Sequence, residues 1–172
     1  MYNKAGLTSL IFLYRMKINL PYKVDPIHVT KDMCDLNGHM NVCFYHQIFE
    51  DNSHFFYTNE LKFTDDHFAS GFSTFTLEDN VRYLKEFLLD DIINIEYALH
   101  SVNNKLLHMI GCLKDKDGNP SAFWETILGH IDMKIRKTAN FKSDHLDYLI
   151  NLSESHKSEM HIDLDIRLKI KK

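Results

Sequence analysis

The chain has few of the residues that hold small extracellular proteins together by covalent bonds. Its three cysteines, Cys34, Cys43 and Cys112, are an odd number, and no two of them stand in a C-x-x-C pair. A disulfide framework and a cysteine-rich zinc site are therefore not expected. A reducing compartment, the cytoplasm, is the predicted location.

Long apolar runs and a large charge of one sign are also missing. Nothing approaches the roughly 18 consecutive apolar residues of a membrane span, so we expect no membrane insertion. The formal net charge of −4 gives no reason to expect nucleic acid as a partner. The 11 histidines include no H-x-x-x-H pair, and the sequence shows no compact carboxylate cluster, so no metal and no other cofactor is predicted.

What is present fits one globular domain. The composition, 44% hydrophobic and 26% charged, is ordinary for a globular protein. A length of 172 residues allows one domain with a sizeable core and is too short for two domains of normal size. We place the domain at residues 19–138, between an extension at 1–18 and a C-terminal helix and amphipathic strand at 139–172. Met16 stands directly before strand-like sequence, so it is a candidate for the natural start of the protein.

One long amphipathic helix is predicted from Asn41 to about Leu61. Asn41 is a good N-cap residue, and no proline or glycine interrupts the run. Apolar residues follow it at the spacing of a single buried face, at Tyr45, Ile48, Phe49, Phe55 and Phe56. A single long helix in a strand-rich chain usually forms the core around which a sheet wraps.

The remaining sequence is dominated by strand patterns. Strands are predicted at 22–30, where Pro26 favours an edge position, and at 72–83, 92–100, 105–113 and 122–135. Asp117-Gly118-Asn119 is a hairpin signal, so the last three of these strands form an antiparallel meander. Residues 61–71 are predicted as a polar connector, residues 143–153 as a second helix, and residues 162–170 as a strand with one apolar face.

The segment Asp35-Leu36-Asn37-Gly38-His39-Met40-Asn41 is the strongest functional signal in the chain. It places a carboxylate, an amide and an imidazole within five residues, directly before the predicted helix. The start of a helix offers free N–H groups and a positive dipole end, which suit a developing oxyanion. We interpret the segment as an active site.

This segment, extended to Tyr45, resembles the signature of the hotdog-fold acyl-CoA thioesterases of the 4-hydroxybenzoyl-CoA thioesterase superfamily, and of acyl-carrier-protein thioesterases. A second block, STFTLEDNVRYLKEFLLDD from Ser73 to Asp91, resembles the carnitine-catabolism subgroup, the betainyl-CoA thioesterases. Asn41 follows the general pattern, and the chain beyond Thr138 matches only loosely. The resemblance implies an α+β hotdog fold, in which a curved antiparallel sheet wraps a long central helix.

The resemblance also implies a reaction, the hydrolysis of a short or polar acyl-CoA such as betainyl-CoA, with coenzyme A as part of the substrate. Asp35 is then the nucleophile or the general base, and the sequence does not separate these roles. Asn37 holds the water or the carbonyl, His39 donates to the carbonyl or orients Asp35, and the N–H groups around Gly38 and His39 form the oxyanion hole.

Other candidates lie further along the chain. Glu78 is a candidate second carboxylate, although an ordinary strand residue is the favoured interpretation. The candidate substrate-binding residues are Asn41, Tyr45, Thr76, Arg82 and Trp124. Tyr45 faces the apolar side of the predicted helix, which favours core packing. A weaker hypothesis groups Trp124 with Tyr83, Tyr97 and Phe75 in an aromatic cage for a trimethylammonium group.

Two alternatives stay open, a hotdog hydratase or dehydratase and a non-catalytic acyl-CoA-binding protein. A homodimer or a tetramer is expected, because a lone curved sheet exposes a strand edge and apolar surface. In such a dimer, Thr76, Glu78 or Arg82 would reach the site from the other subunit.

Overall fold

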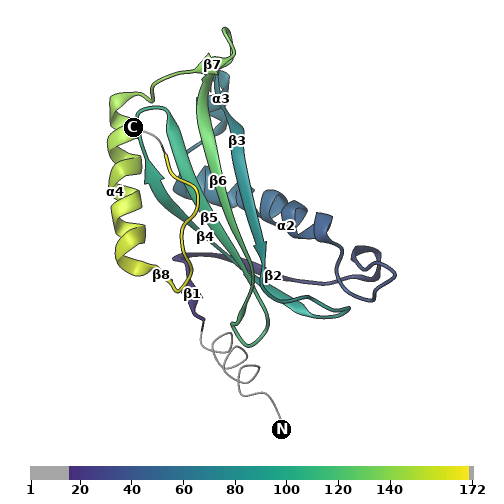
Figure 1. Ribbon diagram of the computed structural model, residues 1–172. Helices are drawn as coiled ribbons and strands as arrows, with labels where there is room; N and C mark the ends of the chain where they lie inside the picture. Colours follow the sequence, from purple (N-terminus) through teal and green to yellow (C-terminus); the bar gives the residue numbers. More distant parts are fainter. Residues whose placement is uncertain (1–15, 171–172) are drawn as a thin grey trace.

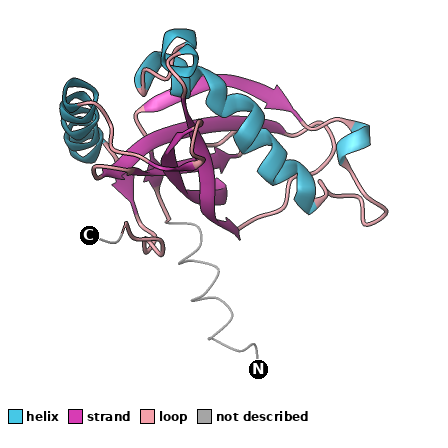
Figure 2. Cartoon of the chain, turned by 90° about the horizontal axis from the view of Figure 1, so that it is seen from above, coloured by secondary structure: helices cyan, strands magenta, loops and turns pink. Residues whose placement is uncertain are grey.

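The computed structural model describes residues 16–170. Its centre is an antiparallel sheet that curves around one long helix, α2, as Figures 1 and 2 show. The strand order is β2-β4-β5-β6-β3, and β7 pairs with the end of β6. The strands are β2 (Tyr22–His28), β3 (Phe72–Tyr83), β4 (Ile92–Val102), β5 (Leu106–Lys114), β6 (Pro120–Asp132) and β7 (Lys137–Thr138). The predicted α+β class and the β4-β5-β6 meander are confirmed.

The β5–β6 turn forms where the Asp117-Gly118-Asn119 signal predicts it. Gly118 has a φ of +82°, a left-handed conformation that glycine adopts without strain. One carboxylate oxygen of Asp115 accepts hydrogen bonds from the N–H groups of Asp117 and Asn119. The other binds Lys85 Nζ at 2.8 Å. The left-handed conformation of Gly118 and the hydrogen bonds to the Asp115 carboxylate together stabilise this turn.

Helix α2 (Val42–Phe55) continues into a π-helical turn, η2 (Phe56–Glu60), so the predicted span is confirmed. Of the predicted apolar face, Tyr45, Ile48, Phe49 and Phe56 are buried. The prediction is wrong for Phe55, which is 61% exposed, because it lies about 100° around the helix from Phe56. The helix lies close to the sheet at Gly111, where an added Cβ would meet the Phe49 ring at 2.9 Å. Phe49 stacks on Trp124, with ring centroids 5.3 Å apart.

The connector at 61–71 contains a short helix that the sequence analysis did not predict, α3 (Asp65–Ala69). The segment was interpreted as turn material because of its polarity. Thr64 followed by two acidic residues is also a typical helix start, since the carboxylates face the positive end of the helix dipole.

Helix α4 (Ser143–Glu159) extends further than predicted and covers an open strand edge. Strand β2 pairs with β4 only as far as Tyr97, so the second half of β4 lacks a strand on that side. His156 of α4 instead accepts a hydrogen bond from the Leu99 N–H at 3.0 Å. The polar residues 154–159 remain helical because this contact holds them against the sheet.

The C-terminal segment buries one apolar face, as predicted, but most of it does not pair with another strand. Only β8 (His161–Ile162) forms a ladder, with β1 (Ile18–Asn19). The rest crosses the sheet face opposite α2 as an extended segment (Figure 1). Its alternating residues Ile162, Leu164 and Ile166 pack against a second apolar cluster. This cluster contains Ile18, Leu20, Ala98, Ile110, Cys112 and Phe123.

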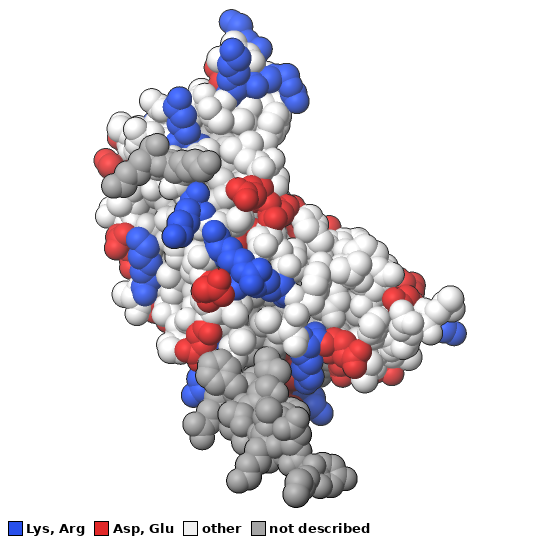
Figure 3. Space-filling model, viewed as in Figure 1, with Lys and Arg blue, Asp and Glu red and all other residues white. Residues whose placement is uncertain are grey.

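The described part of the chain also bears on the predictions about membrane insertion, surface charge and the cysteines. Within residues 16–170, no helix is both long and apolar enough to cross a membrane. Acidic and basic side chains are interspersed over the face seen in Figure 3, and basic ones gather at the β6–β7 turn. The three cysteines are free thiols. The question of Met16 as the natural start concerns residues that lie outside the described part of the chain.

Candidate active site

The segment before α2 folds as a small hairpin. The Asp35 N–H donates to the His39 carbonyl at 3.1 Å, and the Gly38 N–H donates to the Asp35 carbonyl at 3.0 Å. Gly38 has a φ of +83°, which a residue with a Cβ rarely adopts. The turn therefore requires glycine here, and it presents the Asp35 and His39 side chains beside the start of α2.

Asp35 is held by its own loop. One carboxylate oxygen accepts the Asn37 N–H at 2.8 Å, and the other lies 3.4 Å from the Asn37 side-chain nitrogen. The second oxygen also lies 3.7 Å from His39 Nε2. Asn37 thus orients the carboxylate, and its role of holding the water or the carbonyl stays a prediction.

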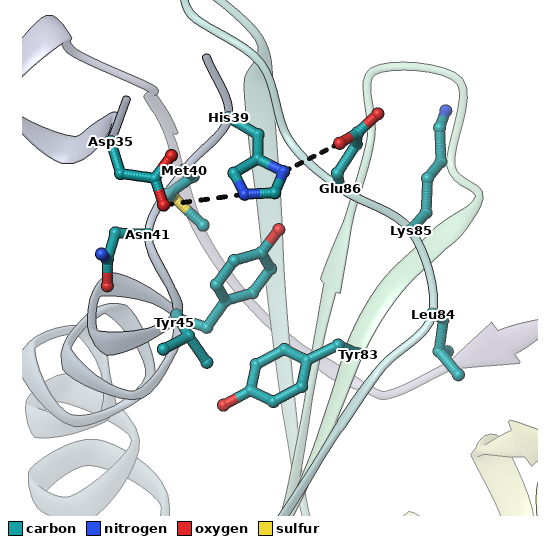
Figure 4. Close-up of a pocket in the computed structure, with 10 residues that line it drawn as sticks. Asp35, His39, Met40, Asn41, Tyr45, Tyr83, Leu84, Lys85 and Glu86 are labelled. Atoms are coloured by element: carbon teal, nitrogen blue, oxygen red, sulfur yellow. Dashed lines mark hydrogen bonds and ion pairs between the residues drawn. The ribbon is translucent and has the colours of Figure 1, made fainter. Parts of the chain in front are cut away.

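His39 lies between two carboxylates, as Figure 4 shows. Its Nδ1 is 2.9 Å from an oxygen of Glu86, which the sequence analysis did not identify. The hydrogen bond to Glu86 raises the pKa of His39, and the negative charges of Asp35 and Glu86 act in the same direction. Glu86 is 47 residues away in sequence. The Ser73–Asp91 block that contains it gave no sign of this contact.

Glu86 is positioned by the loop that follows β3. The Met40 N–H donates to the Phe87 carbonyl at 2.8 Å, and His39 forms a β-bridge with Leu88. The Tyr45 hydroxyl accepts the Phe87 N–H at 3.1 Å. Tyr45 therefore ties the Glu86 loop to α2, and the contacts of His39 and Met40 tie it to the hairpin before the helix.

These residues surround a cavity of about 380 Å³, which we call the Asp35 cavity. Tyr45 is buried and packs edge-on against Tyr83, with ring centroids 5.2 Å apart. Tyr45 therefore combines the predicted core packing with a place in the cavity wall. The wall consists of Asp35, His39, Met40, Asn41, Val42, Tyr45, Tyr83, Leu84, Lys85 and Glu86.

One of the predicted oxyanion donors, the Gly38 N–H, needs correction, and the role of the His39 N–H stays a prediction. The Gly38 N–H closes its own turn, so it is not free to bind a substrate oxygen. At the helix start, Asn41 accepts the N–H of Cys43 with its side chain and that of Phe44 with its carbonyl. Asn41 is thus an N-cap that also lines the cavity. In the described chain, the N–H of Val42, the first helical residue, makes no hydrogen bond.

Thr76, Glu78 and Trp124 do not join the Asp35 cavity. Thr76 and Trp124 line a separate cavity of about 300 Å³ beside α2, which we call the Trp124 cavity. Glu78 is exposed on β3, just after a bulge, and lines neither cavity. The strand pattern placed all three on β strands correctly but did not indicate where along α2 they would lie.

Arg82 lies on the sheet face that points away from α2 and from the Asp35 cavity. The prediction that it contacts the substrate from its own chain is therefore wrong. Its guanidinium binds Glu125 at 3.1 Å and Asp165 at 2.9 Å, and it stacks over the Phe123 ring. Successive residues of a strand face opposite sides. The neighbouring Val81 therefore packs toward α2, and Arg82 faces the C-terminal segment.

The four aromatic residues of the hypothetical cage do not surround one site, although Tyr97 and Trp124 contact each other edge-on with ring centroids 6.5 Å apart. Tyr97 is buried and donates its hydroxyl to the Phe49 carbonyl, while Trp124 donates its indole N–H to Asp79. Tyr83 belongs to the Asp35 cavity. Phe75 lies under the guanidinium of Arg136.

The structure also brings together a compact cluster that the sequence analysis did not find. His46 and Glu50, one helical turn apart on α2, face Asp79 of β3, and their potential ligand atoms all lie within 4.8 Å of one another. These are the described residues whose spacing would suit a metal ion. His46 and Asp79 already form an ion pair at 3.2 Å. The i, i+4 spacing of His46 and Glu50 was the available signal.

Comparison with known proteins places the chain in one family. The thioesterase-like superfamily matches residues 29–149. A curated relative, the L-carnitine dehydrogenase/betainyl-CoA thioesterase of Agrobacterium fabrum, is 27% identical over 124 residues. That match covers 72% of this chain and 25% of the relative, so the chain spans about a quarter of that protein's length.

Solved structures share the fold. A hypothetical protein of Staphylococcus aureus, in complex with CoA, superposes with a TM-score of 0.69 at 23% identity, over 80% of this chain and 89% of that chain. A DHNA-CoA thioesterase from the same species superposes with a TM-score of 0.67 at 16% identity, over 78% of this chain and 92% of that one. The arrangement of α2 and its curved sheet is thus the hotdog fold.

Proposed function

Since the chain belongs to the thioesterase-like superfamily of thioester hydrolases, we propose that it hydrolyses an acyl-CoA at the Asp35 cavity. The observation that carries this proposal is the grouping of Asp35, His39 and Glu86 at the start of α2. The relative from Agrobacterium fabrum is named as a thioesterase, and a structural neighbour was solved with CoA.

In the proposed reaction, Asp35 either attacks the thioester carbonyl or removes a proton from a water that attacks it. In the first route the coenzyme A thiolate leaves and a mixed anhydride forms on Asp35, which water then hydrolyses to the free acid. Both routes need an ionised carboxylate in a fixed orientation, and the two hydrogen bonds from Asn37 supply that orientation. The coenzyme A thiolate leaves without a metal ion, because ordinary thiols have a pKa near about 8.5.

The oxyanion that develops on the carbonyl would face the helix start. There the free N–H of Val42 and the positive end of the α2 dipole favour negative charge. His39 stands beside Asp35 as a second donor, and Glu86 fixes its ring. We assign Glu86 a positioning role, because it acts through His39.

For the acyl group we propose a short or polar chain. The Asp35 cavity of about 380 Å³ is at the small end of ligand pockets and carries two carboxylates in its wall. A cationic acyl group such as betainyl would suit those carboxylates, and the relative's name points to the same substrate.

We also propose a homodimer that forms through β3. This strand of 12 residues stands at the end of the sheet order, where its outer hydrogen-bonding groups face no other strand of the described chain. A long open edge of this kind favours pairing with a second copy. Pairing there would bring the partner's Thr76 and Glu78 toward α2.

The test is a panel of acyl-CoAs that includes betainyl, short aliphatic, long-chain and aromatic thioesters. Release of free thiol would be followed for each compound with purified protein. We expect turnover of the short or polar members. Absence of thiol release from every member would overturn the proposal.

A further inference from the structure

A third cavity lies away from both cavities already described. It has a volume of about 200 Å³ and lies among α3, the start of β3, the end of β6 and the start of α4. His67, His130, His145 and Lys142 line it, and none of its wall residues belongs to the Asp35 cavity. We call it the histidine cavity.

Two imidazole nitrogens in this cavity have no partner. The Nε2 atoms of His67 and His130 are buried, and neither makes a hydrogen bond within residues 16–170. The two rings are 5.3 Å apart between centroids. His130 is 2% exposed and is held between the rings of Phe72 and Phe141. A buried polar atom without a partner is costly, so a bound group is expected here.

The orientation of His130 is fixed by its other nitrogen. Nδ1 lies 2.9 Å from the Ala139 carbonyl, so Nδ1 carries the proton and donates it. In the neutral ring, Nε2 is then a bare acceptor that needs a donor. A ligand that brings a proton, or that stabilises a protonated ring, would satisfy it.

The rest of the wall favours negative charge. Lys142 is the N-cap residue of the 17-residue helix α4, and no side chain of the described residues accepts a hydrogen bond from the first N–H groups of this helix. The first-turn N–H groups of the helix and the ammonium group of Lys142 therefore attract an anion. Of the residues in the wall, Asp66 is the acidic one and opposes the anion.

We propose that the histidine cavity binds a small oxyanion of the size of phosphate, and that His67 and His130 share or take up a proton when it binds. The cavity volume suits a free ion better than a large metabolite, because ligand pockets usually exceed about 300 Å³. Dihydrogen phosphate is a fitting ligand, since its hydroxyl groups donate to Nε2 and its charged oxygens accept from Lys142.

Protonation would link binding to pH. Burial, followed by the positive charges of His130, His145 and Lys142, lowers the pKa of His67 to about 4. Burial also lowers the pKa of His130. The titratable groups facing the cavity are Asp66 and His67 from α3, His130 from β6, and Lys142 and His145 from α4. An anion would raise both histidine pKa values.

The test is a titration of the histidine ring signals by NMR, with the full chain in inorganic phosphate and in chloride at equal ionic strength. We expect phosphate to raise the pKa of His67 and His130. Where one proton is taken up, the affinity should fall by up to about tenfold per pH unit between the pKa of the free protein and the raised pKa of the bound protein. Identical titration curves in phosphate and chloride would overturn the proposal, as would a response to Zn²⁺ but not to phosphate.

Two variants separate binding from folding. Lys142→Gln changes an exposed side chain, and it should weaken phosphate binding by about fivefold, while Lys116→Gln on the exposed β5–β6 turn should not. His67→Gln should abolish the phosphate response of His130, whereas His28→Gln on β2 should leave it intact. Equal phosphate affinity in Lys142→Gln and the parent chain would contradict the proposed site.

Discussion

At the scale of single residues, the imidazole of His39 is the point where two distant parts of the chain meet. Asp35 reaches it from the same hairpin, and Glu86 reaches it from the loop after β3. The motif before α2 could be predicted because its residues are adjacent in sequence. Glu86 could not, because its approach depends on the β-bridge between His39 and Leu88.

The charge of His39 should depend on Glu86. In Glu86→Gln we expect the pKa of His39 to fall from its raised value, because the hydrogen bond to Glu86 is the largest cause of the shift. Measurement is by NMR titration of the ring. Glu154→Gln is the control, since Glu154 is exposed on α4, lines no part of the Asp35 cavity and should leave the titration unchanged.

The same shift predicts a pH-dependent stability. A pKa raised in the folded state stabilises the protein below the unfolded value of about 6.5, and this stability is lost as the pH rises through the folded pKa. Urea unfolding should therefore show Glu86→Gln less stable than the parent chain at low pH, with the gap closing at higher pH. A gap that widens as the pH rises would contradict this assignment.

At the scale of elements, the long helix followed from periodicity, because it buries one face. Strands β5 and β6 are buried along nearly their whole length, on both faces of the sheet, so turn signals and apolar content predicted them instead. The C-terminal segment shows the limit of the argument from periodicity. Its alternating apolar residues bury one face without a neighbouring strand, since Glu125 binds its backbone in place of a ladder. Periodicity reports burial, and it cannot report which group satisfies the N–H atoms.

Gly111 should be essential for the contact between α2 and the sheet. In Gly111→Ala the added methyl group would meet the rings of Phe49 and Trp124 at 2.9 and 3.2 Å, so we expect a loss of about 1–3 kcal/mol in the free energy of unfolding. Gly129→Ala is the matched control. Its methyl group would closely approach only the ends of the Leu77 and Thr138 side chains, at 3.1 and 3.3 Å, and a small rotation of either side chain relieves the contact. Equal losses in urea unfolding would contradict this account.

Glu125 should anchor the C-terminal segment. It is fully buried and accepts the N–H groups of Arg167 and Leu168, while Arg82 pairs with it. We expect Glu125→Gln to lower the free energy of unfolding by on the order of 3 kcal/mol and to speed hydrogen exchange at these two amides. Asp165→Asn, at the exposed end of the same ion pair, should cost about 1 kcal/mol or less.

The anchor should also weaken in acid. Burial alone would raise the pKa of Glu125. His108, whose Nε2 lies 3.5 Å from the carboxylate, the hydrogen bonds from the Leu168 and Arg167 N–H groups and the charge of Arg82 together outweigh burial, so the pKa is lowered. The stabilisation is therefore present above the unfolded pKa of about 4.3 and is lost as the pH falls through the folded value. Faster exchange at high pH than at low pH, after correction for intrinsic rates, would contradict this sign.

At the scale of the whole molecule, the open edge of β3 and the two cavities along α2 favour a site completed by a second copy. We expect sedimentation equilibrium to give twice the chain mass of 20.3 kDa. Leu77→Lys, which adds a charge on β3, should shift the mass toward the monomer, and Ile135→Lys in the exposed β6–β7 turn should not. A monomeric parent chain at all concentrations would exclude the dimer.

The most direct test of the central claim is thiol release from the best acyl-CoA substrate by Asp35→Asn, compared with Asp32→Asn. Asp32 is an exposed carboxylate three residues earlier that binds Thr30, so it controls for the loss of one charge near the site. We expect kcat to fall by about 100- to 10,000-fold in Asp35→Asn and to stay unchanged in Asp32→Asn. Parental activity in a folded Asp35→Asn protein would contradict the assignment of the active site to the Asp35 cavity.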